Sequence, residues 1–326
     1  MKMLLGRSRP ALATRSTAIV VFFGAILLVA GPSIGRYQVA LVTTLLLYVA
    51  AATGWNLIGG VAGQFSLATS AFIGVGSYTV IMLLRSSQIP LWGILMAAAL
   101  FGGVFAAAVG ILLFRLRGFY FTIGTLAVSL AALTWMTTFA FTGATTGISA
   151  PLNLIPDGNT LYLIAIAVAV VALTASIIMI YSPFGLRLMA VRDDEDVAAS
   201  LGVSPFRAKL ITMAVSGALI GIVGGVFALQ KASIEPFSAF SLDWSITVVV
   251  MVIVGGIGTM WGPTIGALII YYGITVQLQN YPAISAILSG VLMVAVIIFL
   301  PSGLVGGLRT GVQRLRQLLD NSTQRR

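Results

Sequence analysis

The sequence contains no cysteine and no histidine. Without cysteine there is no disulfide and no thiolate site, and without histidine there is no imidazole base and no common type of zinc site. The remaining polar residues form no recognisable nucleophile–base or acid–base set. We therefore expect no enzyme activity, no cofactor and no metal.

Lysine is almost absent as well, because it occurs only at positions 2, 209 and 231. None of these three lysines follows a glycine, so the phosphate-binding pattern GxxxxGK[ST] does not occur. The chain cannot be a nucleotide-driven pump by itself.

Charged residues make up only 8% of the chain, whereas about 25% is usual in a soluble domain. Hydrophobic residues make up 59%, and the mean hydropathy is +1.07. This composition predicts an all-α polytopic protein embedded in a lipid bilayer. The net charge of +10 does not indicate a nucleic-acid partner, because the basic residues gather at the ends of apolar segments rather than on one patch.

Runs of about 20 apolar residues, the length that crosses a bilayer, predict about ten transmembrane helices. The eighth and ninth are short, and the glycine-rich stretch between them predicts a broken or re-entrant segment. The basic start resembles a signal peptide, but no small-residue cleavage site follows, so we interpret it as leading into a first membrane helix. The predicted spans are 17–35, 38–58, 65–84, 90–114, 119–140, 160–181, 206–230, 242–257, 263–279 and 283–300.

The distribution of basic residues predicts the orientation of these spans. With the N-terminus in the cytoplasm, 15 of the 18 Lys and Arg residues lie inside, and only Arg36, Arg85 and Lys231 lie outside. Both termini and the polar loop 182–207 are then cytoplasmic. The domain organisation is a basic N-terminal segment 1–16, a transmembrane domain 17–300 and a basic C-terminal tail 301–326.

No Asp, Glu, Lys or Arg lies near the middle of a predicted span. This argues against a proton-coupled carrier and against a charged ion-selective pore, but it leaves sodium coupling through carbonyls and hydroxyls open. Hydroxyls and glycines within the spans could line a path for a neutral or zwitterionic solute. The alternative is that these hydroxyls bond to their own helices and that the glycines pack helices together. The candidate path residues are Ser66, Thr69, Ser70, Thr122, Thr125, Gly255, Gly256 and Gly258.

Small residues recur at the spacing that lets membrane helices approach closely, at Gly217, Gly221 and Gly225 and again at Gly102 and Ala106. We expect these stripes to be helix-packing faces. Two glycine patterns also resemble each other, because residues 59–63 read GGxxG and residues 255–258 read GGxG, each between two predicted helices. This similarity is too short to establish an internal repeat.

The loop from Tyr181 to Lys209 holds half of the eight acidic residues, at positions 193–196. Carboxylates at the start of a short helix complement its dipole, and Gly202 is suited to end that helix in a left-handed turn. Val197, Ala198 and Leu201 share one face by helical spacing. We interpret the segment 193–202 as a docking helix; the alternative is a solvated loop that merely collects charges.

This loop, GLRLMAVRDDEDVAASLG at 185–202, resembles the cytoplasmic coupling region of branched-chain amino acid ABC transporter permeases. Two residues depart from the family's patterns: Thr69 stands where His is frequent, and 142–144 read TGA rather than TGG. Both departures lie near the expected solute path, so the identity of the solute stays open. Four further stretches resemble the family in the same order: GQFSLATSAFIGVGSY at 63–78, RGFYFTIGTLA at 117–127, GGIGTMWGPTIGA at 255–267 and LPSGLVG at 300–306.

The resemblance implies the ABC importer permease fold in a bacterial cytoplasmic (inner) membrane. It implies partners as well: two ABC ATPase subunits, a second permease subunit (a paralogue or an identical chain) and an extracytoplasmic solute-binding protein. The implied function is ATP-driven import of branched-chain or other apolar amino acids, with a stand-alone sodium-coupled carrier or a passive channel as alternatives. The implied ATPase-coupling residues are Arg192, Asp193, Asp194, Glu195, Ala198, Ala199, Leu201 and Gly202.

Overall fold

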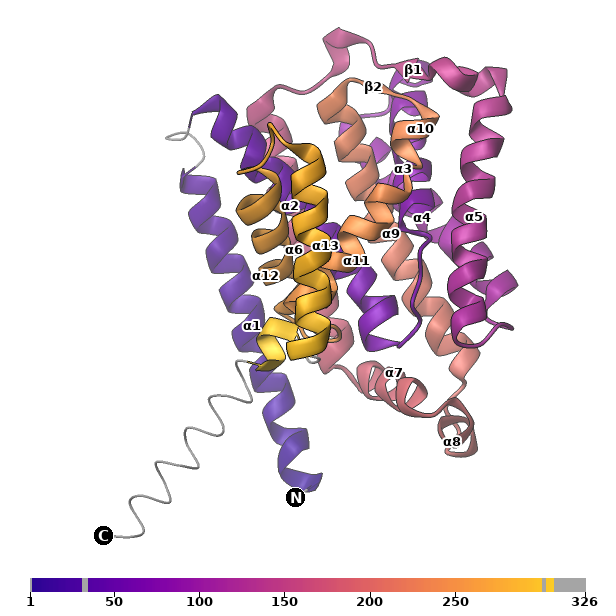
Figure 1. Cartoon of the computed structure of the whole chain (residues 1–326), viewed down its shortest axis with the longest axis vertical. Coiled ribbons are helices and arrows are strands. Elements are labelled where there is room, and N and C mark those ends of the chain that lie inside the picture. The colour runs from indigo at the N-terminus through magenta and orange to yellow at the C-terminus, as the bar shows by residue number, and fades with distance from the viewer. Residues whose placement is uncertain (1, 31–34, 301–302, 308–326) are drawn as a thin grey trace.

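The computed structural model describes residues 2–30, 35–300 and 303–307, and most of them lie in helices that run side by side between two ends of the molecule (Figure 1). One end carries β1, β2 and α10, and we call it the sheet end. The opposite end carries α7 and α8, and we call it the acidic end. The elements at the two ends are β1 (Ile148–Ser149), β2 (Ser233–Ile234), α10 (Pro236–Ala239), α7 (Pro183–Asp193) and α8 (Glu195–Ser200).

The long elements correspond closely to the predicted spans, because each uninterrupted apolar run forms a helix whose backbone bonds are satisfied within the segment. The predicted junction 255–263 is a break between two helices. The remaining elements are α1 (Lys2–Ala30), α2 (Arg36–Asn56), η2 (Leu57–Val61), α3 (Thr69–Ser86), α4 (Leu91–Leu113), α5 (Phe119–Thr138), η3 (Ala140–Thr142), η4 (Ala144–Thr146), η5 (Leu152–Leu154), α6 (Gly158–Tyr181), α9 (Pro205–Lys231), α11 (Leu242–Gly255), α12 (Gly262–Ala267), η6 (Leu268–Thr275) and α13 (Pro282–Phe299).

Within the described ranges, seven helices are long and apolar enough to cross a membrane: Arg36–Val61, Leu91–Leu113, Phe119–Thr138, Gly158–Tyr181, Pro205–Lys231, Pro236–Gly255 and Pro282–Gly307. Two shorter apolar helices, Ala13–Val29 and Gly262–Thr275, also match predicted spans. The one predicted span not yet accounted for, 65–84, corresponds to the helix α3, which carries several hydroxyls and Arg85. The count of about ten spans and the side of each terminus stay predictions.

Both terminal segments are described only in part. The helix α1 begins at Lys2 and runs through the boundary predicted at residue 16. In the predicted C-terminal tail 301–326, only 303–307 lie within the described residues, and they are helical.

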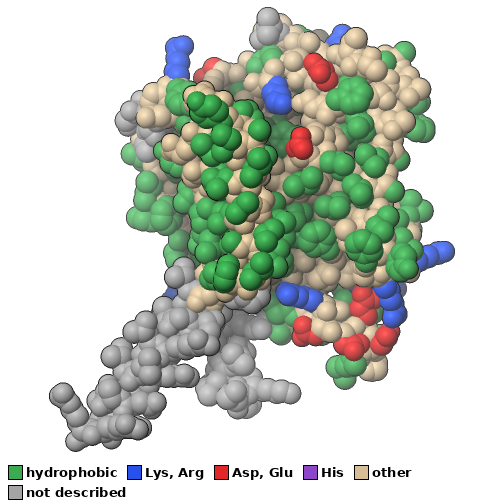
Figure 2. Space-filling view, viewed as in Figure 1, with side chains coloured by type: hydrophobic (Ala, Val, Ile, Leu, Met, Phe, Trp, Pro, Cys, Tyr) green, Lys and Arg blue, Asp and Glu red, His purple; other side chains and the backbone are tan. Residues whose placement is uncertain are grey.

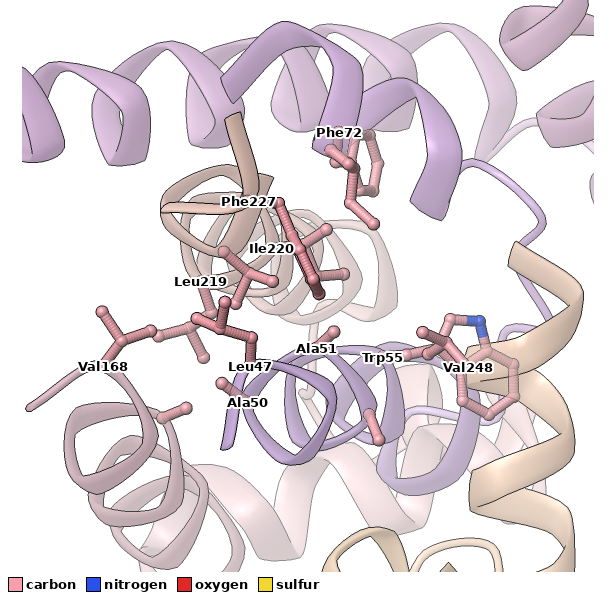
Figure 3. Close-up of a cluster of buried hydrophobic side chains, with 14 of the residues drawn as sticks. Leu47, Ala50, Ala51, Trp55, Phe72, Val168, Leu219, Ile220, Phe227 and Val248 are labelled. Carbon is pink, nitrogen blue, oxygen red and sulfur yellow. The ribbon is translucent and has the colours of Figure 1, made fainter. Parts of the chain in front are cut away.

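The helix α9 lies at the centre of the bundle, where it packs against α2, α3, α4 and α6. Figure 3 shows Leu47, Ala50 and Ala51 of α2 beside Leu219 and Ile220 of α9, all of them buried apart from a few per cent of their surface. This contact forms the middle of the hydrophobic core.

The predicted small-residue stripes form the contact between α4 and α9. A Cβ atom added to Gly102 would lie 2.6 Å from the carbonyl oxygen of Gly217, and one added to Gly221 would lie 2.6 Å from that of Ala98. Only glycine permits this backbone approach, so the packing interpretation of these stripes is confirmed.

The sheet end is closed by a short antiparallel pairing of β1 with β2, with Ile148 opposite Ile234. It joins the loop that follows α5 to the loop that follows α9. The orientation predicted from the basic residues would put both loops outside the cell.

Candidate functional site

The acidic end presents the short helix α8, whose two termini are set by side chains and by a glycine. The Asp194 carboxylate accepts hydrogen bonds from the backbone N–H groups of Asp196 and Val197, each 2.9 Å long. At the other end Gly202 has φ of +83°, and Val203 N–H donates to the Ala198 carbonyl over 3.1 Å. This pattern is an N-cap followed by a Schellman motif, so α8 is a defined helix rather than a slack loop.

Two of the acidic side chains tie α8 to the rest of the protein. Glu195 pairs with Lys209 of α9, whose side chain is only 3% exposed, and it also accepts a hydrogen bond from Gln64. Asp196 accepts two hydrogen bonds of 3.1 and 3.3 Å from Arg117, in the loop between α4 and α5. The Asp196 carboxylate raises the pKa of the Arg117 guanidinium, chiefly through these hydrogen bonds. A nearly buried lysine needs such a partner, so the Lys209–Glu195 pair sets the position of α8.

The outward face of α8 differs in one respect from the predicted one. Ala198 is 1% exposed and packs inward, whereas Val197 is 54% and Leu201 is 76% exposed. Ala199 and Gly202 are exposed as well. Helical spacing identifies the residues that share a face but not the direction in which each points, so Ala198 belongs to the interior contact of this helix and not to a docking face.

Arg192, near the end of α7, is exposed like the acidic residues that follow it, but its guanidinium contacts the membrane domain. Its Nη1 donates a 2.6 Å hydrogen bond to the carbonyl oxygen of Gly60 in η2. A Cβ on Gly63 would lie 2.7 Å from the Arg192 Cγ, and one on Gly258 would lie 2.6 Å from Nη1. Arg192 therefore occupies the space between the two similar glycine patterns.

The buried side chain of Asn56 joins those two patterns directly. Its Nδ2 donates to the Thr259 carbonyl over 2.9 Å, and its Oδ1 accepts from Gly258 N–H over 2.8 Å. Sequence reasoning missed this residue. The available signal was an amide side chain near the end of an apolar run, shortly before a pair of glycines. An amide is costly to bury without hydrogen-bond partners, so its presence there indicates that it has some. We call Asn56, Gly60, Arg192, Gly258 and Thr259 the glycine junction.

Residues 62–68, between η2 and α3, are a non-helical break whose backbone is bonded by side chains from other helices. Thr122 donates to the Phe65 carbonyl over 2.9 Å, and Thr125 accepts from Leu67 N–H over 3.0 Å. Trp55 Nε1 donates to the Ser66 carbonyl over 2.7 Å. Irregular backbone at membrane depth requires such partners.

The helix α11 completes this bonding. The Ser245 hydroxyl donates to the Leu67 carbonyl and accepts from Ser70 N–H, both over 2.9 Å. Ser129 of α5 donates to the same Leu67 carbonyl over 3.0 Å. The break is therefore a fixed structure shared by α3, α5 and α11.

The predicted path residues fall into two groups, one at this break and one at the glycine junction. Thr122 and Thr125 bond to it, and the Ser66 hydroxyl accepts a hydrogen bond from Ala68 N–H. Thr69 and Ser70 are buried, and their hydroxyls have no hydrogen-bond partner in the described part of the chain. The second group, Gly255, Gly256 and Gly258, lies at the end of α11 and reaches the break through the glycine junction.

Comparison with known proteins decides the family. The model of the branched-chain amino acid transport system / permease component family matches residues 37–297. The chain belongs to this family. The permease is 28% identical over 315 residues to the high-affinity branched-chain amino acid transport system permease protein LivM of Escherichia coli, covering 86% of this chain and 73% of that one.

Archaeal relatives resemble the permease to a similar degree. It is 26% identical over 270 residues to the probable branched-chain amino acid transport permease protein LivM of Methanocaldococcus jannaschii, covering 76% of this chain and 77% of the relative. It is also 26% identical over 166 residues to the probable LivH permease protein of that organism, covering 48% and 50% of the two chains. No solved structure matches the permease.

Proposed function

We propose that this permease is a membrane subunit of an ABC importer that moves branched-chain or other apolar amino acids into the cell. Its partners are two ABC ATPase subunits, a second permease subunit and an extracytoplasmic solute-binding protein, assembled in a bacterial cytoplasmic membrane. ATP is hydrolysed on the ATPase subunits, in keeping with the lack of a phosphate-binding loop in this chain.

The observation that carries the proposal is the connection of α8 to the two breaks in the membrane helices, at 62–68 and at 255–263. The helix α8 is capped at both ends, and it exposes Val197 and Leu201 at the acidic end. Behind it, Glu195 bonds to Lys209, and Arg192 bonds to Gly60 within the glycine junction. A protein that pressed on the exposed face would act through short, bonded contacts on both breaks.

We infer the mechanism from these contacts. An ATPase subunit binds the exposed apolar face of α8, and its closure on ATP displaces α7 and α8 together. Arg192 transmits this displacement to Gly60 and Gly258, and Glu195 transmits it to α9. The helices on either side of the two breaks then tilt, and access to the solute path alternates between the sheet end and the acidic end.

Reconstitution tests the proposal. The permease is purified with its ATPase subunits, second permease and solute-binding protein, and is placed in liposomes loaded with ATP. We expect uptake of labelled leucine that requires internal ATP and all the subunits. Uptake by this chain alone, driven by a sodium gradient without ATP, would instead establish the stand-alone carrier. Uptake by this chain alone without ATP or any gradient would establish a passive channel.

A further inference from the structure

An open cavity of about 830 Å³ lies at the sheet end, between α2, α9, α10 and α11. Its lining combines a group of aromatic rings with one basic and one acidic side chain, Lys231 and Asp243. Figure 2 shows Lys or Arg and Asp or Glu side chains beside a hollow next to the upper part of α13. A concave, largely apolar site with a few converging polar groups is typical of small-molecule binding.

The two charged side chains are both held in place but do not neutralise each other. Lys231 Nζ donates to the Ser238 hydroxyl over 3.1 Å, and the Ser241 hydroxyl donates to Asp243 Oδ2 over 3.1 Å. Lys231 and Asp243 form no ion pair with each other, although both lie in the described part of the chain. An ammonium has three donors and a carboxylate has about four acceptor positions, so each group can still bind a ligand.

Aromatic rings line the same cavity as these two charges. The Tyr48 ring centroid is 5.7 Å from that of Phe227 and 5.8 Å from that of Trp244, and those two rings are 4.7 Å apart. Lys231 Nζ is 6.0 Å from the Trp244 centroid. Such rings offer an apolar surface to a hydrocarbon side chain and an attractive face to a ligand ammonium.

We propose that this cavity is a binding site for a zwitterionic α-amino acid with an apolar side chain. The ligand carboxylate bonds to Lys231, its ammonium bonds to Asp243, and its side chain packs on Tyr48, Phe227 and Trp244. The solute class rests on the function proposed above, whereas the site rests on the cavity itself.

The position of the cavity suits the entrance of the solute path. It lies at the end that the charge distribution places outside the cell. Asp243 and Thr247 also line a second cavity, of about 700 Å³, between α11 and α13. The two cavities are therefore neighbours along α11, with Asp243 and Thr247 at both.

The absence of native cysteine permits a direct test. Ser238→Cys, and separately Thr247→Cys, are introduced into the permease of the assembled transporter, without the solute-binding protein. The rate of alkylation of this chain by a small thiol reagent is measured against leucine concentration. Ser149→Cys is the matched control, because Ser149 is exposed at the same end but outside the cavity. We expect leucine to slow alkylation at 238 and 247 and to leave 149 unchanged.

Charge specificity is tested with leucine analogues and variants. Leucinol lacks the carboxylate and 4-methylpentanoate lacks the ammonium, and each should protect at least tenfold more weakly than leucine. Lys231→Gln and Asp243→Asn should raise the half-protecting leucine concentration by about tenfold, the loss expected of one charge-assisted hydrogen bond. Arg85→Gln and Glu235→Gln are the charge-matched controls, since both residues are exposed at this end but do not line the cavity.

The outcomes separate this site from the proposed function. Leucine import by the complete transporter, without protection of either cysteine, would overturn the site and leave the function standing. Protection in a complex that imports no leucine would support the site and contradict the proposed transport. Equal protection by 4-methylpentanoate and leucine would overturn zwitterion recognition, because binding would then not depend on the ammonium.

Discussion

The backbone of Leu67 is held by side chains from other helices. Its N–H donates to Thr125, and its carbonyl accepts from Ser129 and Ser245. Removing one such hydroxyl leaves a backbone group without its partner at membrane depth, where water does not readily replace it. Thr125, which was predicted to line a path, thus has a structural function.

Thr125→Val tests this function because the shape of the side chain is kept while the acceptor for Leu67 N–H is lost. We expect a destabilisation of about 1–3 kcal/mol, the cost of an unsatisfied buried donor, seen as a lower thermal transition in detergent. Thr134→Val is the matched control, since the Thr134 hydroxyl bonds only to the Leu130 carbonyl of its own helix. Equal transitions for both variants would refute a role of Thr125 in holding the break.

Leu201 is the most exposed apolar residue of the proposed docking face. Leu201→Asp should abolish ATP-dependent uptake while the protein stays at normal abundance, because a carboxylate would be buried unpaired against the ATPase. Ala199→Arg should do the same through bulk and charge. Leu201→Met keeps an apolar side chain of similar volume and should retain uptake. Normal uptake by Leu201→Asp would mean that this face docks nothing.

Ala198 and Asn56 mark the limit of prediction at this scale. The spacing of Val197, Ala198 and Leu201 identifies a helix, but the inward direction of Ala198 depends on where α9 and Lys209 lie. The bonds of Asn56 span 202 and 203 residues of sequence, so no local pattern indicates them.

At the scale of elements, η2 is a π-helix, which has a wider turn than an α-helix. It brings Gly60 against the start of the loop after α11. A Cβ on Gly60 would lie 2.5 Å from the Gly258 nitrogen and would also overlap the Asn56 side-chain oxygen. The two glycine patterns that resemble each other in sequence are therefore each other's packing partners. Their similarity was visible in the sequence, whereas their contact depends on the tertiary fold.

Gly60→Ala is expected to destabilise the permease by about 1–3 kcal/mol, the usual cost of overpacking, and to lower uptake. Its control is Gly273→Ala, because a Cβ at position 273 meets no atom within 4 Å. Thermal transitions of the two purified variants give the comparison. An unchanged transition for Gly60→Ala would show that the junction is looser than its geometry implies.

At the scale of the whole molecule, the bundle separates its charges between two ends. Apolar run length predicts nearly all the long helices, because in lipid a segment must satisfy its own backbone bonds. It is less informative for α3 and for α12 with η6, which are shorter or carry more hydroxyls. The pairing of β1 with β2 was not predictable, since each strand has only two residues.

Topology is testable with single cysteines, because the chain has none of its own. In intact cells, cysteines replacing Ser8, Ser200 and Ser322 should be shielded from an impermeant thiol reagent, and one replacing Asn159 should react. Ser200 and Asn159 are both exposed, so accessibility alone does not separate them. Labelling at 200 from outside would reverse the orientation and move the proposed docking face to the wrong side.

The bonding of the break at 62–68 also bears on how the chain is made. Leu67 enters the membrane early in synthesis, but Ser245, which completes its bonds, lies 178 residues later in the chain. Until α11 is synthesised, the Leu67 carbonyl and the Ser70 N–H lack the Ser245 hydroxyl that bonds both of them. We therefore expect a nascent chain that stops after α9 to hold an incompletely bonded membrane segment, and to be degraded faster than the full chain.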